Sequence, residues 1–138
     1  MPAMITGSCL CGGVRYAIDG ELGPVALCHC GMCRKASGSA FATNASVERR
    51  AFRLTGEALV ERYESSPGHW RCFCRVCGSP VFGELAAMPD HVRIRLGLLD
   101  DDPGVRPGYH YAVDFKAPWW EIVDDLPRLE LSAGRTPG

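Results

Sequence analysis

The chain has 138 residues, of which 46% are hydrophobic and 22% charged, and its formal net charge is -1. These values are ordinary for one soluble globular domain with a hydrophobic core, so we expect a single domain over residues 1–138. They argue against nucleic-acid and membrane partners, because phosphate binding needs clustered Lys and Arg and a membrane span needs roughly 20 apolar residues.

Frequent glycine and proline predict a chain with many turns, since 16 Gly and 10 Pro interrupt it at short intervals. In chain order, alternation of apolar and polar residues predicts strands at residues 14–18, 59–63, 92–98 and 109–113. One helical turn is expected at residues 32–37, ended by Gly38. We therefore expect an all-β fold.

The chain's eight cysteines are its most informative feature. Two pairs, Cys9-x-Cys11 and Cys74-x-x-Cys77, each offer two thiols, and the run from Cys28 through Cys30 to Cys33 offers three. No signal peptide is visible at the N-terminus, so we expect a reducing, cytoplasmic location. Cysteine spacings of this kind then indicate metal binding rather than disulfides.

The two pairs together predict one closed zinc site, because four cysteine thiolates form the usual structural arrangement. More than sixty residues separate Cys11 from Cys74, so a shared zinc ion would join distant segments. Such an ion contributes its binding free energy to folding. Gly12 and Gly78 follow the last cysteine of each pair and allow the chain to curl around the ion.

The three-thiol run predicts a second zinc site with one open position, the arrangement in which zinc chemistry takes place. Cys72 could instead supply a fourth ligand and close the site, which would make both sites structural. His29 is less suited to that role, because its neighbours Cys28 and Cys30 would face the metal. An open site holds zinc less tightly than a closed one, so we expect it to be partly occupied.

Four segments resemble the glutathione-dependent formaldehyde-activating enzyme family, which includes centromere protein V-like proteins. In chain order they begin at Gly7-Ser8-Cys9-Leu10-Cys11-Gly12-Gly13, Cys28-His29-Cys30-Gly31-Met32-Cys33-Arg34-Lys35, Phe73-Cys74-Arg75-Val76-Cys77-Gly78-Ser79 and Lys116-Ala117-Pro118-Trp119-Trp120-Glu121-Ile122. The last is followed by Asp125-Leu126-Pro127, so the resemblance extends over most of the chain.

This resemblance implies an Mss4-like β-tent of small antiparallel sheets around zinc. It implies that Cys9, Cys11, Cys74 and Cys77 bind a structural zinc ion and that Cys28, Cys30 and Cys33 bind a catalytic one. The family reaction joins formaldehyde to glutathione, formally a carbon–sulfur lyase reaction in the synthetic direction. We therefore expect a small thiol substrate such as glutathione. Cys72 matches no family ligand and is interpreted as a small buried hydrophobic residue.

The residues beside the open site suggest how such a substrate would be handled. A thiol entering the open corner would lose its proton and become a nucleophile, and Arg34 and Lys35 could attract its carboxylate. His29, His69, His110 and Asp114 have the chemistry of a general acid, but the sequence singles out none of them. We expect at least one of Trp119 and Trp120 to pack in the core.

Two other functions remain open at the level of sequence. A non-catalytic zinc-binding module that contacts a protein partner would be favoured if Cys72 closed the second site. A sulfoxide reductase would need a reactive cysteine outside the metal clusters, and Cys72 has no partner thiol in the sequence around it. The enzyme acting on a thiol adduct is the leading hypothesis.

Overall fold

The computed structural model describes residues 4–133, which form two compact units. The first unit comprises residues 4–23 and 45–105, and the second comprises residues 24–44 and 106–133. Strands dominate both units, which confirms the all-β class. The assignment of residues 1–138 to one domain stays a prediction.

The first unit begins with a three-stranded antiparallel sheet in the order β1-β2-β5. Its strands are β1 (Ile5–Ser8), β2 (Arg15–Ile18) and β5 (Phe52–Thr55). In β2 the alternating residues Tyr16 and Ile18 are buried, as predicted from their apolar character. The register pairs Ser8 with Arg15, so the loop between β1 and β2 contains both cysteines of the first pair.

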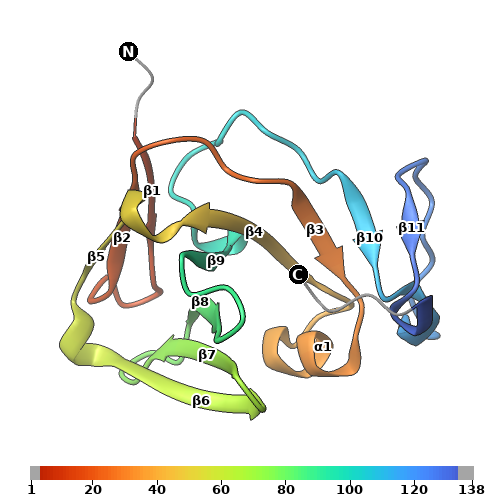
Figure 1. Cartoon of the computed structure of the whole chain (residues 1–138), viewed down its shortest axis with the longest axis horizontal. Helices are drawn as coiled ribbons and strands as arrows, with labels where there is room; N and C mark the ends of the chain where they lie inside the picture. Colours follow the sequence, from red (N-terminus) through yellow and green to blue (C-terminus); the bar gives the residue numbers. More distant parts are fainter. Residues whose placement is uncertain (1–3, 134–138) are drawn as a thin grey trace. The chain divides into compact units, whose positions relative to one another are not determined.

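A second group of strands in the first unit has the order β9-β8-β7-β6, with antiparallel pairing of β6 to β7 to β8 to β9. These strands are β6 (Val60–Ser66), β7 (His69–Cys74), β8 (Pro80–Leu85) and β9 (His91–Arg95). Figure 1 shows β6 and β7 as neighbouring strands of a hairpin. The second cysteine pair lies at the end of β7 (Cys74) and in the turn that leads to β8 (Cys77).

The second unit is built on parallel pairs, in which β10 lies between β3 and β11. Its elements are β3 (Val25–Cys28), the helix α1 (Gly31–Ser37), β10 (Tyr109–Tyr111) and β11 (Arg128–Leu129). All four residues of β3 are buried. The antiparallel pairing expected throughout is therefore found in the first unit, whereas β3 and β10 run parallel because a long stretch of chain connects them.

Short connections complete the described chain. The strand β4 (Ala42–Glu48) leads from the second unit into the first. The 3-10 turns are η1 (Arg49–Ala51), η2 (Glu57–Leu59), η3 (Leu96–Leu98), η4 (Val113–Phe115) and η5 (Leu131–Ala133). Within residues 4–133, no helix is both long enough and apolar enough to cross a membrane.

One strand is shorter than the alternation of apolar and polar residues predicts, and another predicted strand is exposed. Val92 and Ile94 are buried in β9 as predicted, but the strand ends at Arg95 and its expected continuation is the turn η3. Tyr63 lies in β6 as expected, yet it is exposed.

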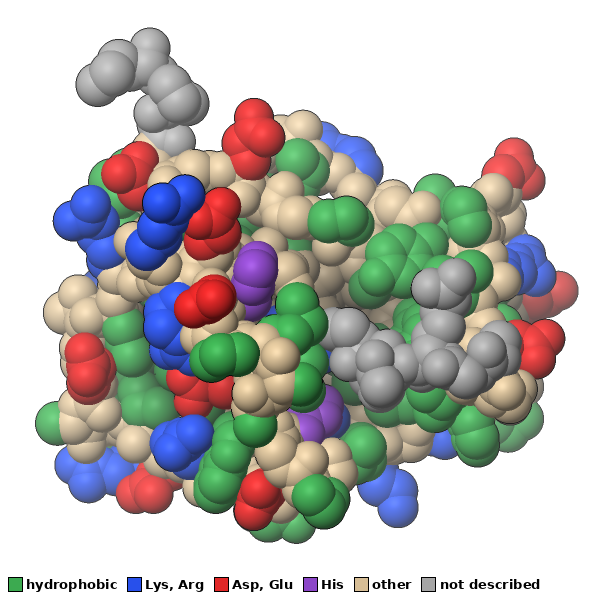
Figure 2. All heavy atoms as spheres, viewed as in Figure 1, with side chains coloured by type: hydrophobic (Ala, Val, Ile, Leu, Met, Phe, Trp, Pro, Cys, Tyr) green, Lys and Arg blue, Asp and Glu red, His purple; other side chains and the backbone are tan. Residues whose placement is uncertain are grey.

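On the face of the described residues drawn in Figure 2, acidic and basic side chains lie interspersed, in keeping with the small net charge.

Candidate metal centres

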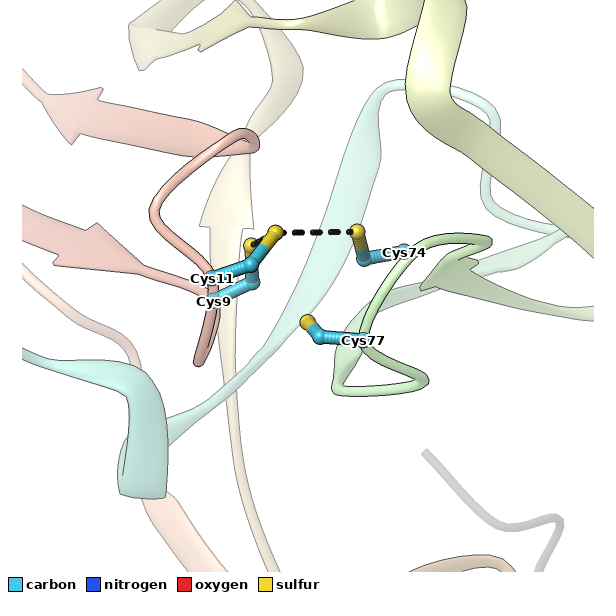
Figure 3. A group of neighbouring side chains, drawn as sticks. All are labelled: Cys9, Cys11, Cys74 and Cys77. Carbon is cyan, nitrogen blue, oxygen red and sulfur yellow. Dashed lines mark hydrogen bonds between the residues drawn. The ribbon is translucent and has the colours of Figure 1, made fainter.

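The first thiol group brings together two loops of the first unit. Cys9 and Cys11 lie in the loop after β1, Cys74 ends β7 and Cys77 lies in the following turn, and their sulfur atoms point toward a common centre (Figure 3). All four Sγ atoms lie within 4.8 Å of one another. The Sγ atoms of Cys9 and Cys11 are 3.6 Å apart, and those of Cys11 and Cys74 are 3.8 Å apart.

Both loops fold by the same backbone pattern. The amide of Cys9 donates to the carbonyl of Val14, and the amide of Cys74 donates to the carbonyl of Ser79, each at 3.0 Å. Gly12 and Gly78 then donate back to the carbonyls of Cys9 and Cys74. These two glycines have φ values of 77° and 80°, in the left-handed region that other residues seldom adopt.

Ser79 links the two loops, a role that sequence reasoning missed. Its hydroxyl accepts a hydrogen bond from the Leu10 amide at 3.0 Å and lies 3.3 Å from the Cys77 sulfur. Hydrogen bonding with Ser79 lowers the pKa of the Cys77 thiol to about 5. Ser79 therefore favours the thiolate form that a metal ion requires.

The geometry of this group fits zinc. A tetrahedral zinc ion with Zn–S bonds of about 2.3 Å holds its sulfur ligands about 3.8 Å apart. The two Sγ–Sγ distances given above, 3.6 and 3.8 Å, are close to this value. Although the Gly13 amide stabilises the Cys11 thiolate, hydrogen bonding with Cys9 and burial raise the Cys11 pKa to about 11. Thiols this close cannot all ionise without a cation among them.

The second thiol group lies at the start of α1 in the second unit. Cys28 ends β3, Cys30 is the N-cap of the helix and Cys33 lies in its first turn. Their three Sγ atoms also lie within 4.8 Å of one another. The Cys30 sulfur accepts a hydrogen bond from the Cys33 amide at 3.3 Å, so the helix cap itself orients one of the three sulfurs.

This second group is buried in apolar surroundings. The three cysteines pack with Ala42, Tyr111 and Ala112, and all six residues are at most 6% exposed. Hydrogen bonding with Cys30 and Cys33, followed by burial, raises the pKa of the Cys28 thiol strongly. Three buried thiolates therefore need a cation to balance their charge, and a thiolate donor set suits zinc.

His29 is not a member of the three-sulfur group, as its position between Cys28 and Cys30 predicts, and its ring contacts His110 instead. Its Nε2 atom is 2.8 Å from Nδ1 of His110, whose Nε2 lies 3.0 Å from a carboxylate oxygen of Asp124. His29 and His110 are 0% and 2% exposed. Burial and the nearby His110 lower the pKa of His29 to about 4, which keeps its ring neutral.

This buried chain from His29 through His110 to Asp124 was not predicted as a unit. Both histidines were candidates for a general acid, but Asp124 was missed because it lies 14 residues from His110 in an irregular segment. The hydrogen bond from His110 holds the pKa of Asp124 below its usual value. A backbone hydrogen bond of 2.8 Å from the His29 amide to the Tyr111 carbonyl also joins the loop of His29 to the strand that carries His110.

The other sequence candidates belong to other segments of the chain. Cys72 is a buried residue of β7 in the first unit, and its sulfur is 3.9 Å from Oε1 of Glu84. Burial raises its pKa to about 11, so Cys72 is an unreactive thiol, in agreement with its interpretation as a buried hydrophobic residue. Asp114 accepts hydrogen bonds from the amides of Leu131 and Ser132, and His69 belongs to the first unit.

The basic pair and the two tryptophans lie in the second unit. Arg34 and Lys35 follow Cys33 in α1, with Arg34 half-buried and Lys35 exposed. Their role in substrate binding stays a prediction. Trp119 and Trp120 are 68% and 40% exposed, so the expectation that one of them packs in the core was wrong. The segment that carries them lacks a regular strand and leaves both rings at the surface.

Fold and sites together define an all-β protein with two thiol groups suited to metal ions. A family model for the glutathione-dependent formaldehyde-activating enzyme matches residues 4–114, and the chain belongs to this family. Among solved structures, a protein from Rhodobacter sphaeroides superposes with a TM-score of 0.61 at 20% identity, covering 89% of this chain and 98% of that one. This likeness shows the fold alone. No curated protein gives a significant match.

Proposed function

We propose that this protein is a zinc-dependent carbon–sulfur lyase-type enzyme that acts on a small thiol adduct, as in the formation of S-hydroxymethylglutathione. The observation that carries the proposal is the second thiol group, in which one short loop supplies three buried sulfurs. Among the residues that the structure describes, no His, Cys, Asp or Glu side chain joins these three sulfurs as a fourth ligand. The family supports a role with glutathione and formaldehyde.

Cys28, Cys30 and Cys33 would hold the catalytic zinc ion, and Cys9, Cys11, Cys74 and Cys77 a structural one. When bound, the catalytic ion supplies an open coordination position that stabilises the thiolate form of a substrate. In the synthetic direction, the thiol gives up its proton, its sulfur bonds to the aldehyde carbon, and the carbonyl π pair moves onto oxygen, which takes up a proton. In the reverse direction, the hydroxyl loses its proton as the carbonyl re-forms, the carbon–sulfur bond breaks, and the bonding pair leaves with sulfur.

The chain's own residues would hold this chemistry in place. The buried contacts with Tyr111 and Ala112 exclude water from the three sulfurs. The hydrogen bond from His29 to His110 fixes the loop between Cys28 and Cys30 from its other side. Arg34 and Lys35, on the next turn of α1, would attract an anionic substrate toward the loop.

Cobalt substitution tests the proposal, because visible absorption of cobalt(II) reports its ligands. Adding glutathione should change the bands of one cobalt ion and leave those of the four-cysteine site unchanged. The change should grow as pH rises, since the incoming thiol must release a proton. Exchange NMR with glutathione and formaldehyde should show faster interconversion than in buffer. A Cys28→Ser variant should lose both effects, whereas the matched control Cys72→Ala should keep them.

Two results would contradict the proposal. If no thiol changes the cobalt spectrum and Cys72→Ala perturbs the second cobalt, Cys72 completes a closed site and the protein is a non-catalytic zinc module. If thiols bind but wild-type protein and Cys28→Ser exchange formaldehyde at the same rate, the site binds thiols without catalysing the reaction.

A further inference from the structure

The first unit contains a cavity that the metal centres do not explain. It has a volume of about 360 Å³, and the ligand pockets of proteins measure roughly 300 to 1,000 Å³. Its lining residues lie between Arg49 and Glu84 in the chain, all within the first unit. No cysteine of either thiol group is among them.

One wall of this cavity is a face of the sheet formed by β6, β7 and β8. The register places Arg62 opposite Cys72, and Cys72 opposite Phe82. Side chains two residues apart on a strand share a face, which adds Val60 on β6 and Glu84 on β8. All five residues line the cavity. This wall therefore combines apolar side chains with an arginine and a glutamate.

A second wall comes from β5, whose alternating residues Phe52 and Leu54 line the cavity. The rings of Phe52 and Phe82 pack with their centroids 5.2 Å apart, and Phe52 also contacts the Tyr16 ring at 5.3 Å. Phe82 is buried, whereas Phe52 and Leu54 are partly exposed. These contacts hold an apolar surface in place, and a ligand that covers it gains the free energy of removing that surface from water.

The polar end of the cavity is an ion-pair network that is ordered without a ligand. The Glu84 carboxylate pairs with Arg49 at 2.6 Å and with Arg62 at 3.0 Å. Nε of Arg49 also donates to the Pro89 carbonyl at 2.8 Å. The Arg62 guanidinium group lies over the Trp70 ring at 4.3 Å. Each arginine therefore has two anchors, which lowers the entropy cost of binding a ligand.

The charges of this network favour one kind of ligand. Two arginines share one carboxylate, so the network has an excess of one positive charge. Glu57, the other acidic residue of the lining, is exposed, so its charge is screened by water and salt. Each guanidinium group has five N–H donors, more than these contacts use. The network therefore repels a cation, whereas a carboxylate finds donors that match its two oxygens.

We infer that this cavity binds a small carboxylate with an apolar body, such as an arylalkanoate. The carboxylate binds Arg49 and Arg62, and the apolar body lies against Phe52 and Leu54. The site needs no metal ion, so this inference goes beyond the proposed function and does not depend on it.

Matched ligands test the inference on the zinc-loaded protein. 3-Phenylpropanoate and 3-phenylpropanamide have nearly the same shape, but only the first is charged. Isothermal titration calorimetry should show that the amide binds about tenfold more weakly, because it lacks the charge-assisted hydrogen bonds. The matched cation 3-phenylpropylammonium should not bind. Propanoate, which lacks the ring, should bind more weakly than 3-phenylpropanoate.

Variants assign the effect to the arginines. Arg62→Gln should raise the dissociation constant for 3-phenylpropanoate about fivefold to tenfold and that for the amide less than about twofold, as expected for losing a partly exposed charged hydrogen bond. Arg53→Gln is the matched control, because Arg53 lies between Phe52 and Leu54 on β5 but on the other face of the strand. It should change neither value.

Glu84→Gln should change the affinity in the opposite direction. It keeps the shape of the side chain and an oxygen acceptor for the arginines, but it removes the negative charge that neutralises one of them. 3-Phenylpropanoate should therefore bind about threefold more tightly, whereas the affinity for the amide should stay the same. Leu54→Trp should fill the cavity and abolish binding of both ligands, with thermal unfolding as the check that this variant is folded.

A carboxylate could also bind at the open position of the second metal centre, so the titration is repeated with Cys30→Ser, which removes a ligand of that metal. Full affinity for 3-phenylpropanoate in this variant is expected, and its loss would overturn the inference. Equal binding of carboxylate and amide by the wild type, an equal loss for both in Arg62→Gln, weaker carboxylate binding in Glu84→Gln or wild-type binding in Leu54→Trp would also overturn it.

Discussion

The two thiol groups differ in what they join. The first connects a loop after β1 with a turn after β7, so its sulfurs come from segments more than sixty residues apart. The second takes all three sulfurs from one loop and one helical turn. A metal ion in the first group closes a long loop, whereas an ion in the second closes a very short one. The first should therefore contribute to folding and the second mainly to chemistry.

The hydrogen bonds also differ between the two thiol groups. In the first group, the hydrogen bonds of Ser79 and of the turns at Gly12 and Gly78 hold the two loops that carry the cysteines. In the second, His29 joins the cysteine loop to β10 through its ring and its backbone amide. The second loop thus has an anchor that needs no metal. This contrast leads to four predictions on the free energy of unfolding, ordered from the largest effect to the smallest.

The largest effect should come from breaking the first thiol group. Cys74→Ser or Cys9→Ala removes a ligand from the ion that joins distant segments, and the binding free energy at risk is on the order of 10 kcal/mol, comparable with the stability of a domain. We expect unfolded or insoluble protein, measured by circular dichroism and soluble yield. A soluble Cys74→Ser variant with an unchanged melting temperature would contradict the long-range role of this group.

Breaking the buried anchor of the second unit should have the next largest effect. His110→Ala leaves the ring of buried His29 without its partner and opens a cavity, which together should cost about 2–4 kcal/mol. Urea unfolding measures the loss. Asp124→Asn is the matched control, because this side chain is 45% exposed and can retain a hydrogen bond to His110. If both variants lose the same stability, the His29–His110 contact is not the principal anchor.

Sequence reasoning predicted both thiol groups because close spacing along the chain carries the information. Cys28, Cys30 and Cys33 are so near in sequence that almost any turn brings their sulfurs together, and the glycines after Cys11 and Cys77 predicted the local turns. The joining of the first two cysteine pairs followed from the number of ligands that zinc requires. The structure brings together the sulfurs of each group, while their metal content stays a prediction.

Long-range partners could not be predicted in the same way. Asp124 reaches His110 from a segment without regular structure, and Ser79 reaches the Leu10 amide across 69 residues. Periodicity extended the strand at 92–98 beyond Arg95, because burial of Val92 and Ile94 does not show where a strand ends. Size alone favours a core position for at least one of Trp119 and Trp120, since a sequence does not show that a ring lies on an irregular segment.

A smaller effect on stability should follow from Cys30→Ser, although the second metal should be lost completely. Serine retains an oxygen that can cap α1, so the cost should be about 1–2 kcal/mol. Zinc content and circular dichroism on the same sample should show one zinc ion fewer and an intact β spectrum. Global unfolding on loss of this zinc would make the second group structural and remove the contrast between the two sites.

The smallest effect should come from Cys72→Ala, the one change to a cysteine that belongs to neither group. Its thiol is buried beside Glu84 and held protonated by a pKa of about 11, so it contributes as a small apolar side chain. Losing one buried sulfur atom should cost at most about 1 kcal/mol. Because Glu84 also pairs with Arg49 at 2.6 Å and Arg62 at 3.0 Å, its carboxylate keeps both partners in the variant. Cobalt spectra should be unchanged at both sites, and metal analysis should give the wild-type content. Loss of either metal would show that Cys72 acts as an additional ligand. The distinction between a long-range and a local thiol group would then not hold.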